Sequence, residues 1–164
     1  MTAAVDESAL RDAAATFCTG VVVITAMSEG EPVGMSVQSF VSLSIDPPLA
    51  SFSPSRTSRS WPRIRSAGRL AVNVLAADQS ELSRRFAISG GDKFHRVDWE
   101  RGENGAPLLA GALTCFEADI QYEVPGGDHT IAIVRLTRAQ PLRTAEPLVY
   151  FRRGYHRIAA TDQA

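Results

Sequence analysis

Alternating apolar and polar positions define the clearest element of this chain, a strand predicted over residues 112–124. Side chains two residues apart lie on the same face of a strand, so this period of two is typical of β structure. The turn sequence Pro125-Gly126-Gly127 follows it and leads into a second predicted strand, residues 129–136. One face of the first strand carries Thr114, Phe116, Ala118, Ile120, Tyr122 and Val124, and the other carries Glu117, Asp119, Gln121 and Glu123.

Runs of β-branched residues predict further strands. Residues 21–27 and 69–75 have the composition of buried strands. A strand region that begins at Val33 ends at Asp46-Pro47-Pro48, because proline cannot donate a hydrogen bond to a β-ladder. Shorter strands are predicted over 49–53, 147–151 and 155–158, the last two as a hairpin around 152–154.

Helical spacing and capping residues predict three helices. The first covers residues 6–18 and begins with Asp6 as its cap. The second starts at Trp61, where a proline follows in the first turn and its missing N–H does no harm. The third opens on the capping-box pattern Asp78-x-x-Glu81 and runs through Phe86.

The order of these elements indicates the fold class. Many short strands and three helices, without regular βαβ alternation, predict a mainly β (α+β) chain built on an antiparallel barrel with helices outside. Residues 90–111 are rich in glycine, proline and charge, which predicts a long surface loop. Since neither a linker nor an internal repeat interrupts the pattern, we expect one domain over residues 1–164.

Composition and charge exclude several classes of function. The chain has 164 residues, 45% of them hydrophobic and 21% charged, which is ordinary globular composition. A net charge of −1 predicts no general attraction to nucleic acid or to anionic lipid. Neither a membrane-spanning apolar run nor a secretory signal is evident. Cys18 and Cys115 are far apart and form no CxxC pair, which favours two reduced thiols over a disulfide and predicts a cytoplasmic protein.

The loop Ser53–Ser60 is the first candidate for chemistry. It offers five hydroxyls and two arginines directly before a predicted helix N-terminus. Backbone N–H groups, the helix dipole and arginine donors all favour a bound phosphate at such a place. A solvated loop in which Ser60 only caps the helix explains the same residues, and composition leaves both interpretations open.

Two further segments carry weaker signals. Small residues and the amide of Gln38 in the segment 34–40 suit a planar polar ligand, although the residues alone favour an ordinary half-buried strand. In Gly127-Asp128-His129, a histidine lies where a turn enters a strand, and such a group can donate to a cofactor or titrate near neutral pH. A lone histidine is more often structural.

Other chemistries find no pattern in the sequence. The three histidines lack metal-ligand spacing, so we predict no metal site. The signatures GxSxG, GxGxxG and GxxxxGK[ST] are absent. A series of arginines between residues 56 and 69 fits a solvated helix face better than an RNA site, because aromatic platforms are missing.

Several segments, taken together and in this order, resemble the flavin reductase family, the reductase components of two-component flavin-dependent monooxygenases. The resemblance runs from Phe17 to Ile158. The segments that carry it are 19–25, 34–48, 53–61, 71–75, 82–87, 91–94 and 127–129.

The resemblance implies a split antiparallel β-barrel of Greek-key type, with a few flanking helices, that pairs as a homodimer and binds FMN or FAD near the subunit interface. Residues matching the family's ring-binding segment are Met35, Ser36, Val37, Gln38 and Ser39. Those matching its ribityl and phosphate loop are Ser51, Phe52, Ser53, Ser58 and Ser60. Lys93 and Phe94 match a further flavin contact, and Asp128 and His129 match the nicotinamide site.

The implied activity is hydride transfer from nicotinamide C4 to flavin N5, followed by hand-over of reduced flavin to a separate monooxygenase. His129 is the implied catalytic residue, as a group that orients the nicotinamide, since cofactors carry this chemistry themselves. The family often has Asn where Gln38 stands, and its turn is less rich in glycine than residues 125–127. NADH is favoured over NADPH because no basic cluster lies near His129 in the sequence.

Two other functions on a similar barrel stay open. One is a non-catalytic flavin-binding or carrier protein. The other is a flavin oxidase of the pyridoxamine phosphate oxidase type. The Gly-Asp-His turn favours the reductase, since a carrier does not need a nicotinamide site.

Overall fold

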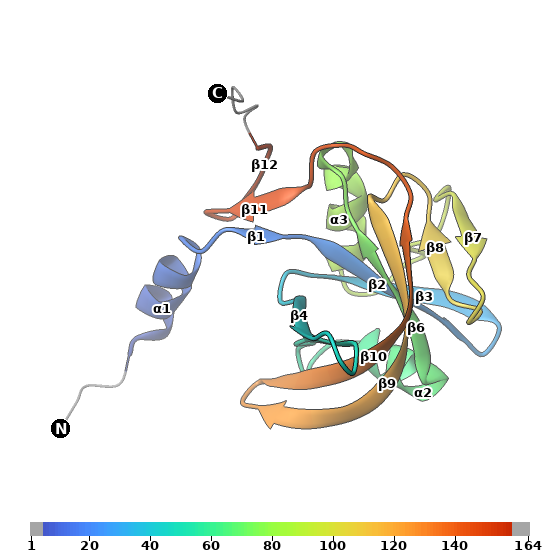
Figure 1. The fold of residues 1–164 in the computed structure, drawn as a ribbon. Coiled ribbons are helices and arrows are strands. Elements are labelled where there is room, and N and C mark those ends of the chain that lie inside the picture. The colour runs from blue at the N-terminus through green and yellow to red at the C-terminus, as the bar shows by residue number, and fades with distance from the viewer. Residues whose placement is uncertain (1–4, 159–164) are drawn as a thin grey trace.

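A seven-stranded antiparallel sheet forms the body of the molecule in the computed structural model, which describes residues 5–158 (Figure 1). Its strand order is β3-β2-β6-β9-β10-β5-β4. These strands are β2 (Val22–Ser28), β3 (Glu31–Val37), β4 (Val41–Ser44), β5 (Leu49–Phe52), β6 (Arg69–Val74), β9 (Thr114–Gly126) and β10 (His129–Pro141).

Smaller elements surround this sheet. The helices are α1 (Glu7–Ala14), α2 (Trp61–Ala67), the 3-10 turn η1 (Ala77–Gln79) and α3 (Ser80–Ala87). The remaining strands are β1 (Thr19–Gly20), β7 (Trp99–Arg101), β8 (Pro107–Leu109), β11 (Val149–Phe151) and β12 (Gly154–His156). β1, β11 and β12 form a separate three-stranded sheet, and β7 pairs with β8.

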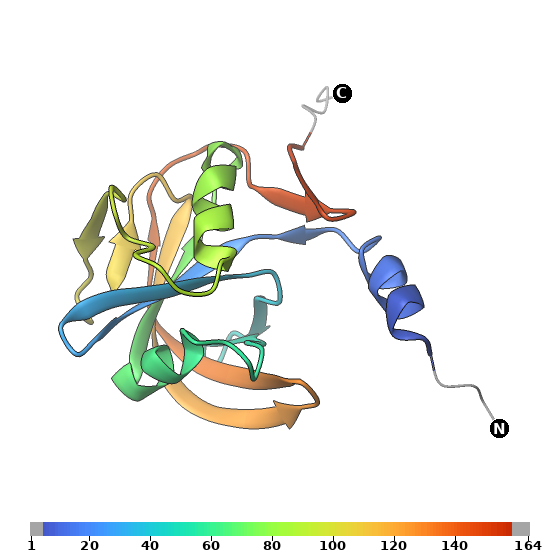
Figure 2. The ribbon, with the colours of Figure 1, turned by 180° about the vertical axis from the view of Figure 1, so that it is seen from behind.

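The prediction of a mainly β, antiparallel chain with three α-helices is confirmed over the described residues. Figures 1 and 2 show the large sheet strongly curved, with the β9–β10 hairpin curling beneath α2. The sheet nevertheless begins at β3 and ends at β4, and these two strands do not pair. Its ladder is therefore open. The ends of the expected domain, residues 1–4 and 159–164, lie outside the described residues.

β2 is buried on both faces, which explains its uninterrupted β-branched sequence. Side chains such as Ile24 join a core inside the curve of the sheet, where α2 contributes Trp61 and Ile64. Val23, on the opposite face, joins a second core beneath α3 that includes Phe86. A strand between two apolar layers has no polar face, and its pattern therefore lacks alternation.

The predicted loop over residues 90–111 is wrong in its second half, where β7 and β8 form a hairpin. Long-range hydrogen bonds hold it: the backbone N–H of Asn104 donates to buried Glu117 at 2.5 Å, and Thr25 donates to the Pro107 carbonyl at 2.5 Å. Strands of three residues are too short to show a period, and Thr25, which holds this hairpin, lies far away in sequence.

The capping box predicted at Asp78 and Glu81 is also wrong. Asp78 lies in η1, one turn before α3, and its carboxylate pairs with Arg143 at 2.5 Å. The hydrogen bond from Arg143 lowers the pKa of Asp78. Instead, the Gln79 side chain accepts a hydrogen bond from the Ala76 N–H at 3.0 Å.

The first helix begins where predicted but ends earlier. Asp6 caps it by accepting a hydrogen bond from the Ala9 N–H at 3.1 Å, and the helix stops at Ala14. No residue of α1 is buried, and the helix projects from the body (Figures 1 and 2). An ion pair of Asp12 with Arg153 links it to the C-terminal hairpin.

Both cysteines are free thiols, as predicted, with Cys18 exposed and Cys115 buried. Burial raises the pKa of Cys115 to about 12. Among the described residues, no helix is long and apolar enough to cross a membrane.

Gly34 permits the closest approach between β3 and α3. A Cβ at this position would lie 2.6 Å from Cε1 of Phe86 and 3.0 Å from the Ile24 carbonyl oxygen. Phe86 cannot move aside easily, because it is 1% exposed and packs edge-on against Phe94.

We therefore expect Gly34→Ala to lower the free energy of unfolding by about 1–3 kcal/mol, the usual range for overpacking a core. Gly20→Ala is the matched control, since a Cβ at Gly20 meets nothing within 4 Å. Chemical denaturation followed by circular dichroism compares the two variants. Equal stability of both would show that Phe86 does not pack against Gly34 as described.

Candidate active site

Two adjoining hollows lie between β3, the loop that follows β5, and the end of α3. The larger, called here the His129 hollow, has a volume of about 510 Å³. The smaller, the Ser58 hollow, has about 180 Å³ and shares four lining residues with the first. The His129 hollow is lined by Met35, Ser36, Val37, Gln38, Ser39, Ser53, Ser55, Ala87, His129, Tyr150 and Tyr155.

These hollows bring together most of the residues predicted from the sequence. The segment Met35–Ser39, Ser53 and His129 line the His129 hollow. Ser58, Ser60 and Lys93 line the Ser58 hollow. Segments separated by up to about a hundred positions in sequence thus form one continuous groove, because β10 pairs with β5 and places His129 beside the loop.

The loop Ser53–Ser60 is fixed by hydrogen bonds at its start. Its first residue donates from its backbone N–H to the Ser39 hydroxyl at 2.8 Å, which joins the loop to the segment after β3. The Arg56 N–H donates to the Asp128 carbonyl, and the Thr130 N–H donates to the Pro54 carbonyl, both at 3.0 Å. The loop is therefore held against the turn that carries His129.

Ser60 occupies the N-cap position of α2, but its side chain makes no capping hydrogen bond. Ser58 takes the helix N-terminus instead, where its hydroxyl accepts a hydrogen bond from the Trp61 N–H at 3.2 Å. The Ser60 hydroxyl accepts one from the Lys93 ammonium at 3.3 Å. α2 has seven residues, which limits what its dipole contributes.

Lys93 supplies a half-buried positive charge at the end of the groove. Its ammonium donates to the Gly34 carbonyl at 3.1 Å, to the Phe86 carbonyl at 3.2 Å and to Ser60. All three acceptors are neutral, and within residues 5–158 no carboxylate forms an ion pair with it. Desolvation lowers the pKa of Lys93. Its charge is therefore free to attract an anion.

His129 lies at the other end of the groove and is oriented by its neighbour. Its Nδ1 lies 2.8 Å from a carboxylate oxygen of Asp128. A carboxylate can only accept, so Nδ1 carries the hydrogen and Nε2 is left to bind a ligand. The hydrogen bond from His129 lowers the pKa of Asp128, which is fully exposed on the turn. Neutral His129 can therefore accept a hydrogen bond through Nε2, and the protonated ring can donate one.

Three residues that were predicted to contact the flavin line neither of these two hollows. Ser51 and Phe52 belong to β5, are buried, and line neither hollow. The ring of Phe52 packs edge-on against Trp61 at 5.4 Å between centroids, so only its backbone is available to a ligand. Phe94 is buried against Phe86, outside both hollows.

Sequence reasoning missed the aromatic wall of the His129 hollow. Tyr150 and Tyr155 come from the C-terminal hairpin and lie edge to face at 5.3 Å. The Tyr155 hydroxyl lies 2.8 Å from the Ser83 hydroxyl, which lies 3.0 Å from that of Ser36. No local motif marks these tyrosines, because only the pairing of β11 with β1 brings them to the groove.

The groove fits a flat ligand that carries a phosphate. Small side chains and two aromatic rings line one end, and hydroxyls with an unpaired ammonium line the other. Charge-assisted hydrogen bonds from such donors are the usual means of holding phosphate. Among the described residues, no group of three or more His, Cys, Asp or Glu side chains is arranged to hold a metal ion.

The fold and the groove thus define a mainly β protein suited to a phosphate-bearing, planar cofactor. The family model for the flavin reductase like domain matches residues 14–159. Because this match covers most of the chain, the protein belongs to the flavin reductase family.

Known relatives agree with this assignment. The chain is 40% identical over 152 residues to a flavin-dependent monooxygenase, reductase subunit HsaB, of Rhodococcus jostii, covering 93% of this chain and 78% of the relative. It is 41% identical over 140 residues to the FMN reductase (NADH) SmoA of Agrobacterium fabrum, covering 85% and 79%. The structure of NADH:FAD oxidoreductase SgcE6 of Streptomyces globisporus, in complex with NAD and FAD fragments, superimposes with a TM-score of 0.90 at 36% identity, over 97% of this chain and 96% of that one.

Proposed function

We propose that this protein is an NAD(P)H-dependent flavin reductase that transfers hydride from a nicotinamide to FMN or FAD and supplies the reduced flavin to a separate monooxygenase. The observation that carries this proposal is the groove itself. An oriented histidine lies at one end and an unpaired ammonium at the other, with small and aromatic side chains between them.

Met35 to Gln38 would hold the flavin ring, and Ser39 and Ser53 would meet the chain that leads to its phosphate. Ser58, Ser60 and Lys93 would bind the phosphate. Bound flavin supplies the hydride acceptor. The protein positions the reactants and excludes water, which is the usual contribution of an enzyme to cofactor chemistry. Ser51 and Phe52 support the loop from β5 and contribute through their backbone.

His129 would orient the nicotinamide through Nε2, which the hydrogen bond of Nδ1 to Asp128 leaves available. NADH is the favoured donor. The 2′-phosphate of NADPH calls for basic side chains, and Arg56, beside this turn, already donates to the Gly127 carbonyl at 3.4 Å. The names of SmoA and SgcE6 also specify NADH.

We infer that two copies of the chain pair, with the flavin near their interface, and that the open, curved sheet is the split barrel of the family. Several large apolar side chains are exposed, and we infer that they belong to the surface through which the two copies pair. They lie on α1 and on the strands β4 and β9: Leu10, Val41, Leu43, Tyr122 and Val124. Because both thiols are free, we place the protein in the cytoplasm.

Purified protein is expected to oxidise NADH only when FMN or FAD is added, with a rate that saturates in the flavin. Absorbance at 340 nm measures this, in assays without flavin, with FMN and with FAD, each repeated with NADPH. Flavin binding without turnover in every combination would contradict the reductase and favour a carrier or a split-barrel oxidase.

His129→Ala is expected to lower flavin-dependent NADH oxidation by about tenfold or more, since misplaced reactants lose the benefit of orientation. The dissociation constant of the flavin should change by less than about threefold, because the phosphate end of the groove is intact. Exposed His95 is the matched control, and His95→Ala should retain full activity. An unchanged rate in His129→Ala would remove this residue from the nicotinamide site.

A further inference from the structure

A buried hydroxyl lies behind the wall of the His129 hollow. Ser83, in the middle of α3, is fully buried and lines neither the His129 hollow nor the Ser58 hollow. A serine inside a helix usually bonds to the backbone of the preceding turn or points to solvent. Among the described residues, however, the Ser83 hydroxyl bonds only to the hydroxyls of Ser36, at 3.0 Å, and Tyr155, at 2.8 Å. Both partners line the His129 hollow.

These three hydroxyls can be connected in only two ways, because each has a single hydrogen to donate. If Ser36 and Tyr155 both donated to Ser83, the Ser83 hydrogen would be buried without an acceptor. Such groups are rare, since they cost the full free energy of desolvation. Ser83 therefore donates to one neighbour and accepts from the other. One hydrogen is left over at one end of this chain of hydroxyls, where it is available to a ligand in the hollow.

Tyr155 is the expected donor to Ser83. A phenol is more acidic than an aliphatic alcohol, which makes it the better donor and the poorer acceptor. Arg84 lies over the face of the tyrosine ring, 5.0 Å from its centroid, and helps to hold the phenol against α3. The chain of donors then runs from Tyr155 to Ser83 to Ser36, and the Ser36 hydrogen is the one left for a ligand.

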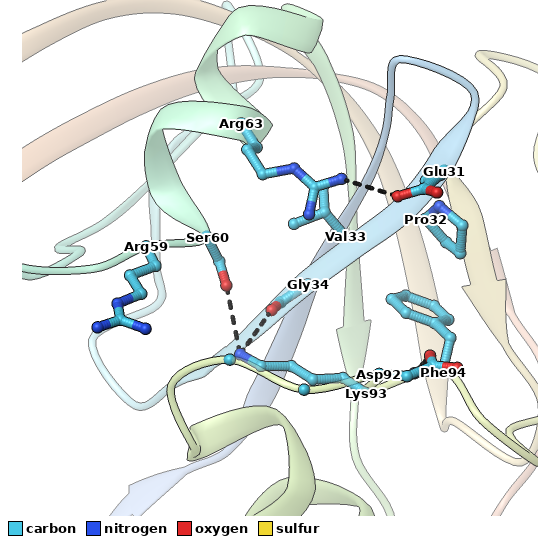
Figure 3. A pocket seen from close by; sticks show the side chains of 12 residues that line it. Glu31, Pro32, Val33, Gly34, Arg59, Ser60, Arg63, Asp92, Lys93 and Phe94 are labelled. Carbon is cyan, nitrogen blue, oxygen red and sulfur yellow. Dashed lines mark hydrogen bonds and ion pairs between the residues drawn. The ribbon is translucent and has the colours of Figure 1, made fainter.

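A separate interaction holds the backbone near Ser36. Figure 3 shows the Lys93 ammonium at the carbonyl of Gly34, two residues before Ser36 on β3. The same ammonium donates to the Phe86 carbonyl on α3 at 3.2 Å. The strand and the helix thus keep their spacing without the bond between Ser36 and Ser83, which determines only where the Ser36 hydrogen points.

We propose that Ser83 is a positioning residue that makes Ser36 a hydrogen-bond donor to the flavin ring, and that this donor favours the reduced ring. The inference rests on the proposed function, which places the ring against Met35 to Gln38. Hydride brings two electrons and one proton to the neutral ring, so the reduced ring carries one additional negative charge. A hydrogen bond to a charged acceptor is stronger than one to a neutral acceptor. A donor that is fixed in advance therefore makes the ring a better acceptor of hydride.

Equilibrium binding of oxidised and reduced flavin to the purified full-length protein tests this proposal without turnover. The probes are FMN and FAD, each oxidised and each reduced with dithionite in the absence of oxygen, and isothermal titration gives their dissociation constants. The proteins are the unaltered chain, Ser36→Ala, Ser83→Ala, the variant with both changes, and Tyr155→Phe. Ser80→Ala is the matched control, because Ser80 lies on the same helix and lines neither hollow.

Ser36→Ala and Ser83→Ala should each weaken the binding of reduced flavin about fivefold more than that of oxidised flavin, the difference between a charged and a neutral acceptor. Ser80→Ala should bind both forms as the unaltered protein does. The double variant should lose no more than Ser36→Ala alone, because Ser83 acts through Ser36. A purely structural role of Ser83 would instead add a second loss.

Three results would overturn the inference. The first is an equal loss of oxidised and reduced flavin in Ser83→Ala, and the second is additive losses in the double variant. The third is a larger selective loss in Tyr155→Phe than in Ser36→Ala, which would reverse the direction of the chain of hydroxyls. Failure of both flavins to bind the unaltered protein would contradict the proposed function, and the inference with it.

Discussion

The Lys93 ammonium joins three parts of the molecule that are distant in sequence. It donates to the backbone of β3 at Gly34, to the end of α3 at Phe86, and to the loop before α2 at Ser60. The groove lies between these same three elements, so one side chain fixes their spacing. Because every acceptor is a neutral oxygen, the lysine holds the structure together without losing its charge. A carboxylate among these acceptors would pair with the ammonium and leave little attraction for a phosphate.

Close packing of β3 against α3 brings the acceptors of Lys93 together. Gly34 lets Phe86 approach the strand, and the carbonyl of each residue faces the same ammonium. The segment after Gly34, Met35–Ser39, then lines the groove. Stability and binding therefore depend on the same few residues. Replacing Gly34 should therefore disturb the groove through the core.

Local patterns predicted the strands and helices well where the elements are long. The alternation over 112–124 and the buried run 21–27 correspond to β9 and β2. The β7–β8 hairpin was missed because its stability comes from Glu117 and Thr25, which lie in other strands. Arg143, the charged partner of Asp78, is also distant in sequence, so the local capping pattern could not predict this ion pair.

The candidate site was partly predictable for the same reason. Three short motifs can be recognised from the sequence alone: Met35–Ser39, Ser53 to Ser60 and the Gly-Asp-His turn. Tyr150 and Tyr155 reach the groove only through tertiary pairing. The orientation of Phe52 depends on Trp61, which no motif specifies. The individual ligand contacts stay predictions.

A crystal structure of the protein grown with FAD tests the central claim most directly, because it locates the bound cofactor. The account predicts density for the flavin ring against Met35–Gln38 and for its phosphate beside Ser58, Ser60 and Lys93, with His129 at the opposite end. A flavin ring bound outside the His129 hollow, with Lys93 contacting no phosphate, would contradict it.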